Sequence, residues 1–132
     1  MLKRERKINE YLLNKLMSGS RLPFNSKLHS SLPNKAGVYY IFEETSTKQI
    51  PLYLGKATNL YYRVYKEHFM GTPKDSNLKG KLINSHQCKD GNDAKQYLRE
   101  RCFVQYVEIE DESLRNSFER FAINSLKPRY NF

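Results

Sequence analysis

The chain has 132 residues, enough for one domain with one hydrophobic core. Hydrophobic residues make up only 39% of it and aromatic residues 13%, so much of the core must be aromatic. The formal charge of +9 favours a polyanionic partner, most often nucleic acid. No apolar run reaches the ~18 residues of a membrane span, and the start lacks the apolar stretch of a secretory signal. We therefore expect an intracellular, cytoplasmic protein with no membrane partner. Its two cysteines show no zinc-ligand spacing and are expected to be free thiols.

The N-terminal part of the chain carries most of the charge. Residues 1–36 hold eight basic and two acidic side chains, which is +6 of the net +9. Residues 2–17 are predicted as a helix, because Ile8, Leu12 and Leu16 recur at helical spacing. Glycine, prolines and small polar residues predict a connector after it. We expect two parts, a basic N-terminal helix and connector at 1–33 and a second domain at 34–132.

A hairpin follows the connector. Residues 37–43 and 49–55 are predicted as strands, with a turn over 44–48. A hairpin symmetric about Ser46 places Tyr39 directly opposite Tyr53 on one face, and Pro51 opposite Ile41. Because proline has no N–H to donate, Pro51 indicates that its strand lies at an edge. The tyrosine pair is either cross-strand packing, worth up to ~1 kcal/mol, or part of a reactive site.

The rest of the chain is predicted to be mostly helical. Asn59 can cap a helix that runs to about Met70, and Asp75 or Ser76 can start another. That second helix would carry on one side Leu78, Leu82, Ile83 and His86. Residues 89–92 form a turn, 93–99 are ambiguous, and 102–109 read as a third strand. A last helix is predicted from the Asp111 cap to Leu126, ended by Pro128. This order predicts an α+β domain, a small three-stranded antiparallel sheet (order 2-1-3) flanked by helices.

Five sequence elements resemble the GIY-YIG nuclease family. They are "GVY" at 37–39, "YLG" at 53–55, "KATNLYYR" at 56–63, a glutamate at 119 on a late helix, and an asparagine at 131 in the closing "KPRYNF". The resemblance covers residues 34–132, and "YLGKA" is most similar to excision-repair and restriction-type members. It implies hydrolysis of DNA phosphodiester bonds with one divalent cation, Mg²⁺ or Mn²⁺.

The resemblance also implies roles for single residues. Glu119 would hold the metal, and Arg63 would grip the phosphate. Tyr39 would be the general base, helped by Lys56, while Tyr53 would hydrogen-bond the water or phosphate. Asn131 would position its neighbours, unless it is a plain C-terminal turn residue. We also expect the following residues to bind nucleic acid: Lys3, Arg4, Arg6, Lys7, Lys56, Asn59, Arg63 and Lys66.

Glu119 and Arg63 can also be judged from their own surroundings. On a helix of about 100° per residue, Glu119 falls within the apolar arc of its helix, where a carboxylate is costly unless paired. Arg115, four residues earlier, offers a buried salt bridge as the alternative to a metal. Arg63 could instead be a solvated arginine paired with Glu67 at i+4.

One position departs from the family pattern. Many members carry a histidine four residues after the helix arginine, where this chain has Glu67, and His68 follows it. On a regular helix His68 joins the Leu60 and Val64 stripe and turns away from Arg63. We therefore expect a packed histidine, which could act as the base only if the helix is distorted.

The sequence thus favours a stand-alone, metal-dependent DNA endonuclease acting on double-stranded or branched DNA. The alternative is a nucleic-acid-binding module that keeps the fold and does not cut. Repair, restriction and mobile-element roles all stay open, and target choice would come from the N-terminal helix, a homodimer or a partner protein.

Overall fold

A four-stranded antiparallel sheet in the order β1-β4-β2-β3 forms the centre of the fold. The computed structural model describes residues 2–132. The strands are β1 (Leu22–Pro23), β2 (Gly37–Glu44), β3 (Gln49–Ala57) and β4 (Cys102–Glu108). The α+β prediction and the relative order of the three predicted strands are confirmed. The number of strands is wrong, because the connector contributes β1, which pairs with Phe103 and Val104 of β4. A two-residue strand is too short to show the alternation by which strands are read from sequence.

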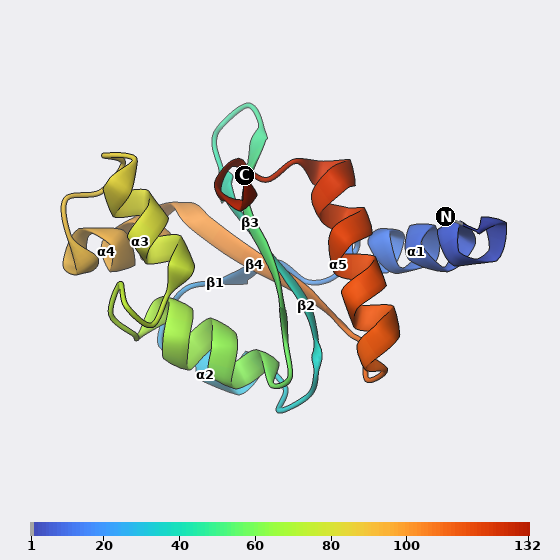
Figure 1. The fold of residues 1–132 in the computed structure, drawn as a ribbon. Helices are drawn as coiled ribbons and strands as arrows, with labels where there is room; N and C mark the ends of the chain where they lie inside the picture. The colour runs from blue at the N-terminus through green and yellow to red at the C-terminus, as the bar shows by residue number, and fades with distance from the viewer. Residues whose placement is uncertain (1) are drawn as a thin grey trace.

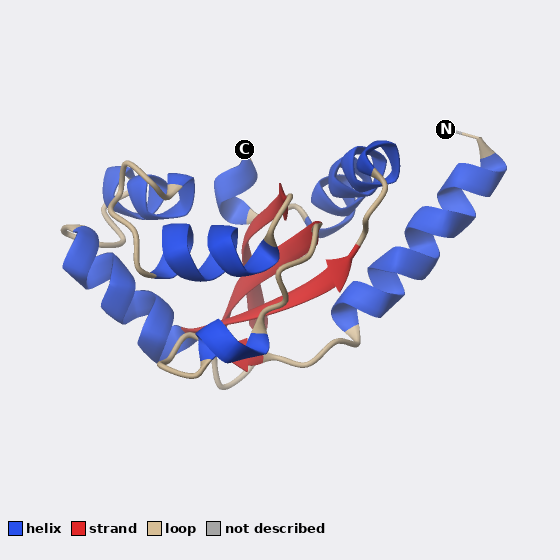
Figure 2. Ribbon diagram, turned by 90° about the horizontal axis from the view of Figure 1, so that it is seen from below, coloured by secondary structure: helices blue, strands red, loops and turns tan. Residues whose placement is uncertain are grey.

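Helices cover both faces of this sheet (Figures 1 and 2). One face packs α1 (Lys3–Met17) and α5 (Glu112–Leu126). The other packs α2 (Leu28–Ser31), the π-helix η1 (Tyr61–Phe69), α3 (Asn77–Asn84) and α4 (Gly91–Arg101). A short 3₁₀ turn, η2 (Arg129–Asn131), ends the chain. Of the helices among residues 2–132, none is long and apolar enough to cross a membrane.

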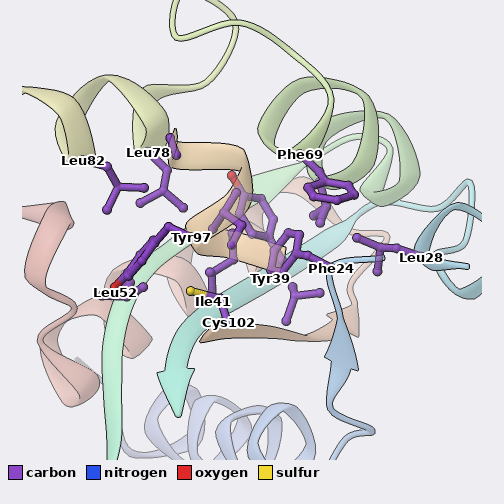
Figure 3. Packing of buried hydrophobic residues seen from close by; sticks show 14 of the residues in the cluster. Phe24, Leu28, Tyr39, Ile41, Leu52, Phe69, Leu78, Leu82, Tyr97 and Cys102 are labelled. Atoms are coloured by element: carbon purple, nitrogen blue, oxygen red, sulfur yellow. The ribbon is translucent and has the colours of Figure 1, made fainter. Parts of the chain in front are cut away.

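The central strand β2 supplies both cores. Val38, Tyr40 and Phe42 face α1 and α5, whereas Tyr39 and Ile41 face the other helices, and all five are fully or almost fully buried. Burial on both faces explains why β2 reads as a continuous apolar run instead of alternating. Figure 3 shows Tyr39 and Ile41 among the second set of packed side chains, so the predicted aromatic core is present.

The hairpin register differs from the predicted one. Tyr39 pairs with Gly55, and Tyr53 pairs with Ile41, so the two tyrosines are diagonal neighbours on one face. A bulge shifts the ladder between Ile41 and Phe42, which puts Pro51 opposite Phe42. The symmetric hairpin could not anticipate this, because a bulge inserts one unpaired residue. The edge position predicted for the Pro51 strand is confirmed.

Most predicted helix starts are confirmed. The Ser76 side chain caps α3 by accepting from the Lys79 N–H, and Asp111 caps α5 by accepting from Leu114. Residues 93–99, which were ambiguous, lie in α4 behind an Asp90 cap. His86 is a correction: it lies beyond α3, exposed and with φ 65°, so it is not on the apolar side of that helix.

The N-terminal helix α1 packs on the domain. Leu12 and Leu16 are buried against the core that includes α5, whereas Ile8, predicted in the same stripe, is 41% exposed. The Ser117 hydroxyl of α5 donates to Glu5 at 2.7 Å and accepts from the Asn9 amide at 3.2 Å. The basic end of α1 is therefore anchored to the middle of α5.

Candidate active site

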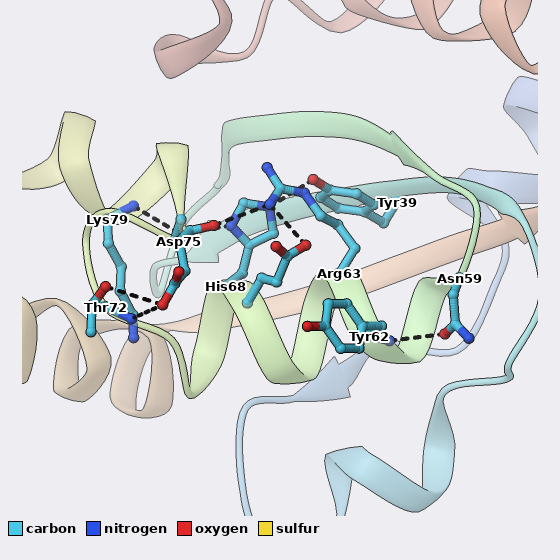
Figure 4. Close-up of polar contacts among 10 residues, drawn as sticks. Tyr39, Asn59, Tyr62, Arg63, His68, Thr72, Asp75 and Lys79 are labelled. Atoms are coloured by element: carbon cyan, nitrogen blue, oxygen red, sulfur yellow. Dashed lines mark hydrogen bonds and ion pairs between the residues drawn. The ribbon is translucent and has the colours of Figure 1, made fainter.

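Tyr39 is the centre of the candidate site. Its hydroxyl lies 2.6 Å from His68 Nε2 and also hydrogen-bonds the Arg63 side chain (Figure 4). The Tyr53 ring lies beside it, with 6.3 Å between ring centroids. Burial raises the pKa of the Tyr39 hydroxyl, Tyr53 adds to the rise, and Arg63 opposes it. Two strands and one helix thus bring Tyr39, Tyr53, Arg63 and His68 together.

Gly55 makes room for the Tyr39 ring. The two residues pair across the hairpin, and a Cβ on Gly55 would collide with the Tyr39 hydroxyl and lie 2.6 Å from its Cζ. This close approach explains the glycine of "YLG" without any appeal to backbone flexibility. The tyrosine and glycine of the two motifs are therefore parts of one contact.

The helix that carries Arg63 is a π-helix, and this corrects the expected place of His68. The Met70 N–H bonds the Tyr65 carbonyl five residues back, at 2.9 Å. Residues five apart share a face in such a helix, so Arg63 and His68 both reach Tyr39. His68 is fully buried, and the prediction that it turns away from Arg63 is wrong. Burial, together with the charges of Arg63 and Lys79, lowers the pKa of His68 to about 3, so its ring is neutral.

Arg63 has three partners. Its guanidinium pairs with Glu67 at 3.1 Å, donates to the Asp75 carbonyl at 3.1 Å, and bonds Tyr39. The Glu67 pair at i+4 that the sequence offered as an alternative is present, yet it does not keep Arg63 away from Tyr39. These contacts hold the guanidinium at the wall of a hollow of about 490 Å³, which is also lined by Lys56, Asn59 and Tyr62.

Glu119 lies on α5, facing β3. It pairs with Lys56 Nζ at 3.9 Å, and Lys56 also donates to the Asn116 side chain at 2.7 Å. The alternative salt bridge is not formed, because the Arg115 guanidinium donates instead to the Ile109 and Glu110 carbonyls. Burial raises the pKa of Glu119, with Lys56 opposing the rise. The charge of Glu119 also acts on the Tyr39 hydroxyl, which places the two in one electrostatic site.

These residues fit a metal held by one protein carboxylate. Within residues 2–132, no group of three or more His, Cys, Asp or Glu side chains could hold an ion. Glu119 is half-buried, and its ion pair with Lys56 is long at 3.9 Å. A bound cation close to the carboxylate would therefore stabilise its charge more than Lys56 does. Mg²⁺ commonly takes one or two carboxylates and keeps several waters, which matches this donor set.

Asn131 is a structural partner of strand β3. Its amide accepts from the Leu54 N–H and donates to the Leu54 carbonyl, both at 2.8 Å. The side chain thus supplies the edge of β3 with the two hydrogen bonds that a further strand would give. Leu54 lies between Tyr53 and Gly55, so the two hydrogen bonds of Asn131 also fix the position of these neighbours. This supports a positioning role for Asn131 over that of a plain turn residue.

The residues expected to bind nucleic acid lie in two places. Lys56 and Lys66 are exposed, and Lys56 lines the hollow beside Arg63. The Asn59 side chain accepts from the Tyr62 N–H and donates to Asn34, which gives it a capping role. The four basic residues of α1 are exposed and lie away from Tyr39, as follows: Lys3, Arg4, Arg6 and Lys7.

Sequence reasoning missed two buried polar residues beside the site. Ser76 contacts His68, with 2.8 Å between its Oγ and Nδ1. Lys79, 2% exposed, donates to the Phe69 and Gly71 carbonyls at 2.6 Å and so caps the end of η1. The cap signal of Ser76 was visible in the sequence, but its contact with His68 had no signal there.

Comparisons with known proteins point to one family. No protein-family model matches the chain. The chain is 32% identical over 101 residues to UvrABC system protein C of Wolinella succinogenes. That match covers 76% of this chain and 15% of the relative, so the chain spans about a seventh of that protein's length.

Solved structures of the GIY-YIG N-terminal endonuclease domain of UvrC from Thermotoga maritima also match. The form bound to magnesium as its catalytic divalent cation is 19% identical, has a TM-score of 0.46, and is matched over 100% of both chains. A tyrosine-to-phenylalanine mutant of that domain gives the same TM-score and is covered over 99%. With the ordered motifs, the sequence similarity to UvrABC system protein C confirms the resemblance of this chain to the GIY-YIG nuclease family.

Proposed function

We propose that this chain is a divalent-metal-dependent DNA endonuclease that hydrolyses phosphodiester bonds. The observation that carries the proposal is the convergence on Tyr39 of Arg63, Tyr53 and the charge of Glu119, from three different elements. A packed aromatic pair alone would not need an arginine bonded to the hydroxyl and a carboxylate close enough for its charge to act on it. The 32% sequence identity to UvrABC system protein C supports a nuclease of this family.

Each residue has a chemical task in this proposal. Arg63 binds nonbridging phosphate oxygens, for which a planar guanidinium is well suited. Tyr39 accepts the proton of the attacking water, and Tyr53 hydrogen-bonds that water or the phosphate. Lys56 places positive charge beside the developing negative charge. One Mg²⁺ or Mn²⁺ held by Glu119 would supply Lewis-acid charge stabilisation at the phosphate.

The Tyr39 hydroxyl needs help to act as a base. Its pKa is raised by burial in the free protein, so the phenolate is favoured only when cations face it. Arg63 is already in place, and Lys56 lies on the paired strand. The proposal therefore predicts that cutting depends on the metal and rises with pH.

A nicking assay on supercoiled plasmid, with and without Mg²⁺, tests the function. Wild type should cut only with the metal. Glu119→Gln should lower the rate by more than about 100-fold, because the metal ligand is lost, while DNA affinity stays within about threefold. Glu112→Gln, an exposed change on the same helix, is the matched control and should cut normally.

Two outcomes would contradict the proposal in different ways. A Glu119→Gln protein with wild-type turnover would remove the metal assignment. A wild type that binds DNA but never cuts would instead support the non-cleaving binding module. Strandedness, a homodimer and a targeting partner stay predictions, and DNA binding assays on duplex and branched substrates address the first of these.

A further inference from the structure

A buried chain of hydrogen bonds leads away from Tyr39. The Tyr39 hydroxyl lies 2.6 Å from His68 Nε2, and His68 Nδ1 lies 2.8 Å from the Ser76 hydroxyl. His68 and Ser76 are 0% exposed and Tyr39 is 1% exposed, so solvent does not compete for these bonds. Figure 4 shows His68 between Tyr39 and the segment that leads into α3.

The direction of this chain follows from the cap of α3. Ser76 Oγ accepts the Lys79 N–H at 3.1 Å, and its own hydrogen needs an acceptor. Among residues 2–132 the acceptor in reach is His68 Nδ1. If Ser76 donates to Nδ1, the neutral imidazole carries its hydrogen on Nε2 and donates to the Tyr39 oxygen.

The reverse direction is less favourable. It would leave the Ser76 hydrogen without an acceptor in a fully buried place, at a cost of about 1–3 kcal/mol. When Ser76 donates to His68 and His68 donates to Tyr39, the hydrogen without a partner in this chain is that of the Tyr39 hydroxyl. That hydroxyl neighbours the half-buried Tyr53 and Arg63, and Arg63 lines the hollow through which water and substrate would enter.

We propose, on the basis of the nuclease function above, that Ser76 and His68 are positioning residues for the general base. Ser76 fixes the His68 tautomer, and His68 donates its Nε2–H to the Tyr39 oxygen. With the Arg63 bond, the Tyr39 oxygen then receives two donors, an arrangement that favours the phenolate. His68 itself neither gains nor loses a proton in the reaction.

The protons balance in this scheme. Tyr39 first releases its hydroxyl proton to a water molecule that enters through the hollow beside Arg63. In the chemical step the phenolate takes a proton from the attacking water as the new P–O bond forms and the bond to the leaving oxygen breaks. Charged and titratable groups that act on this network are Tyr53 from β3, Arg63 from η1, Lys79 from α3 and Glu119 from α5.

Two substitutions distinguish a His68 that donates a hydrogen bond to Tyr39 from a His68 that acts as the general base. The amide of His68→Gln can still donate to Tyr39 but cannot take a proton, whereas His68→Leu can do neither. We expect His68→Gln to keep the rate within about tenfold of wild type. His68→Leu should lose at least about tenfold more, and the rising limb of its pH–rate profile should move up by about one unit. If His68 were the base, both variants would be equally inactive.

The role of Ser76 is tested by a double-mutant cycle. Ser76→Ala should slow cutting and raise the pH of the rising limb in the wild-type background. It should have little further effect in the His68→Gln background, where the donor no longer depends on Ser76. Asp90→Ala, which removes the cap of α4, is the control for the loss of a helix cap and should leave the pH profile unchanged. Equal effects of Ser76→Ala in both backgrounds would overturn the assignment.

The tautomer of His68 can be measured directly in the wild-type protein, without any variant that has to fold. The ¹⁵N shifts of the imidazole in labelled wild-type protein report its tautomer, and we expect the hydrogen on Nε2. A hydrogen on Nδ1 would overturn the proposal. If the wild type does not cut any DNA, the nuclease function fails, but the tautomer measurement still decides the direction of the chain.

Discussion

At the scale of single residues, Tyr39 combines two properties that normally conflict. It is almost completely buried in an aromatic core, yet its hydroxyl is bonded by Arg63 and His68. Packing fixes the position of the oxygen, and the polar partners decide its protonation. A site of this kind needs little reorganisation when substrate binds.

Replacing Tyr39 by phenylalanine separates these properties. Tyr39→Phe keeps the ring but removes the base, so cutting should fall by at least about 100-fold in a single-turnover assay. Tyr40→Phe is the control, because its hydroxyl lies on the opposite face of β2 and bonds Gln49. Wild-type turnover by Tyr39→Phe would exclude the hydroxyl from the reaction.

The buried His68 predicts acid sensitivity of the fold. Its pKa is about 3 in the folded protein and about 6.5 when unfolded, so the unfolded chain binds more protons between these values. Its contribution to stability is complete at neutral pH and is lost as pH falls below about 6.5. We expect the free energy of unfolding to drop by about 2 kcal/mol between pH 7 and pH 5, measured by urea unfolding.

His68→Gln should abolish most of that pH dependence. His86→Asn is the matched control, since His86 is exposed and asparagine tolerates its positive φ. A wild-type slope in His68→Gln would show that other groups cause the acid sensitivity.

At the scale of elements, the site depends on two local irregularities. The bulge in the hairpin puts both Leu52 and Tyr53 on the core side that holds Tyr39. The π-helix brings His68 under the same hydroxyl, and the buried Lys79 caps its last carbonyls. Because Lys79 is 2% exposed, its charge serves this cap and does not face solvent.

The contact between the hairpin strands can be tested by filling it. Gly55→Ala should destabilise the fold by about 1–3 kcal/mol and displace the Tyr39 ring, since the new methyl collides with it. Gly80→Ala, inside α3, brings its Cβ only to van der Waals contact with the Pro73 carbonyl at 3.6 Å, so it should be neutral or stabilising by up to about 1 kcal/mol. Thermal unfolding of both variants checks this, and an unchanged Gly55→Ala protein would contradict the packing.

At the scale of the whole molecule, helix α5 connects the basic helix α1 to the candidate active site. The Ser117 hydroxyl holds α1, while Asn116 and Glu119 face Lys56. We propose that the exposed basic end of α1 provides a second contact with the DNA backbone, one helix away from the chemistry. The competing view, that its charges only keep the helix soluble, shares the same packing.

Salt titration of DNA binding distinguishes these views. We expect changing Lys3, Arg4, Arg6 and Lys7 to glutamine to weaken binding for all sequences and to flatten the slope of log affinity against log salt. Each lost phosphate contact lowers that slope by about 0.9 on duplex DNA. Turnover at saturating DNA should be preserved.

The control for this experiment is a variant that loses the same four positive charges from loops instead of from α1. Glutamine at four exposed loop lysines, Lys27, Lys35, Lys48 and Lys89, matches the change in net charge. If the two quadruple variants have equal slopes, α1 is not the contact, and the track lies along Lys56 and Lys66.

Most helices and strands, and the residues proposed for the site, can be predicted from the amino-acid sequence. Helix caps such as Asp111 and the Pro51 edge strand are local or short-range signals, and they predicted the α+β fold. Tyr39, Tyr53 and Arg63 were placed in one site by the order of the motifs that resemble the GIY-YIG nuclease family. The place of Glu119 in an apolar arc was also readable, because helical spacing needs no tertiary information.

The hairpin register, the fourth strand and the place of His68 depend on contacts between distant parts of the chain. The bulge and the π-helix each shift spacing by one residue, and that shift is stabilised by contacts distant in sequence, such as Tyr39 with His68 and Lys79 with Phe69. The prediction from periodicity assumed a regular α-helix, and on such a helix His68 points away from the site. The link from Ser76 to Tyr39 joins three separate elements, and it exists because the fold buries all three side chains together.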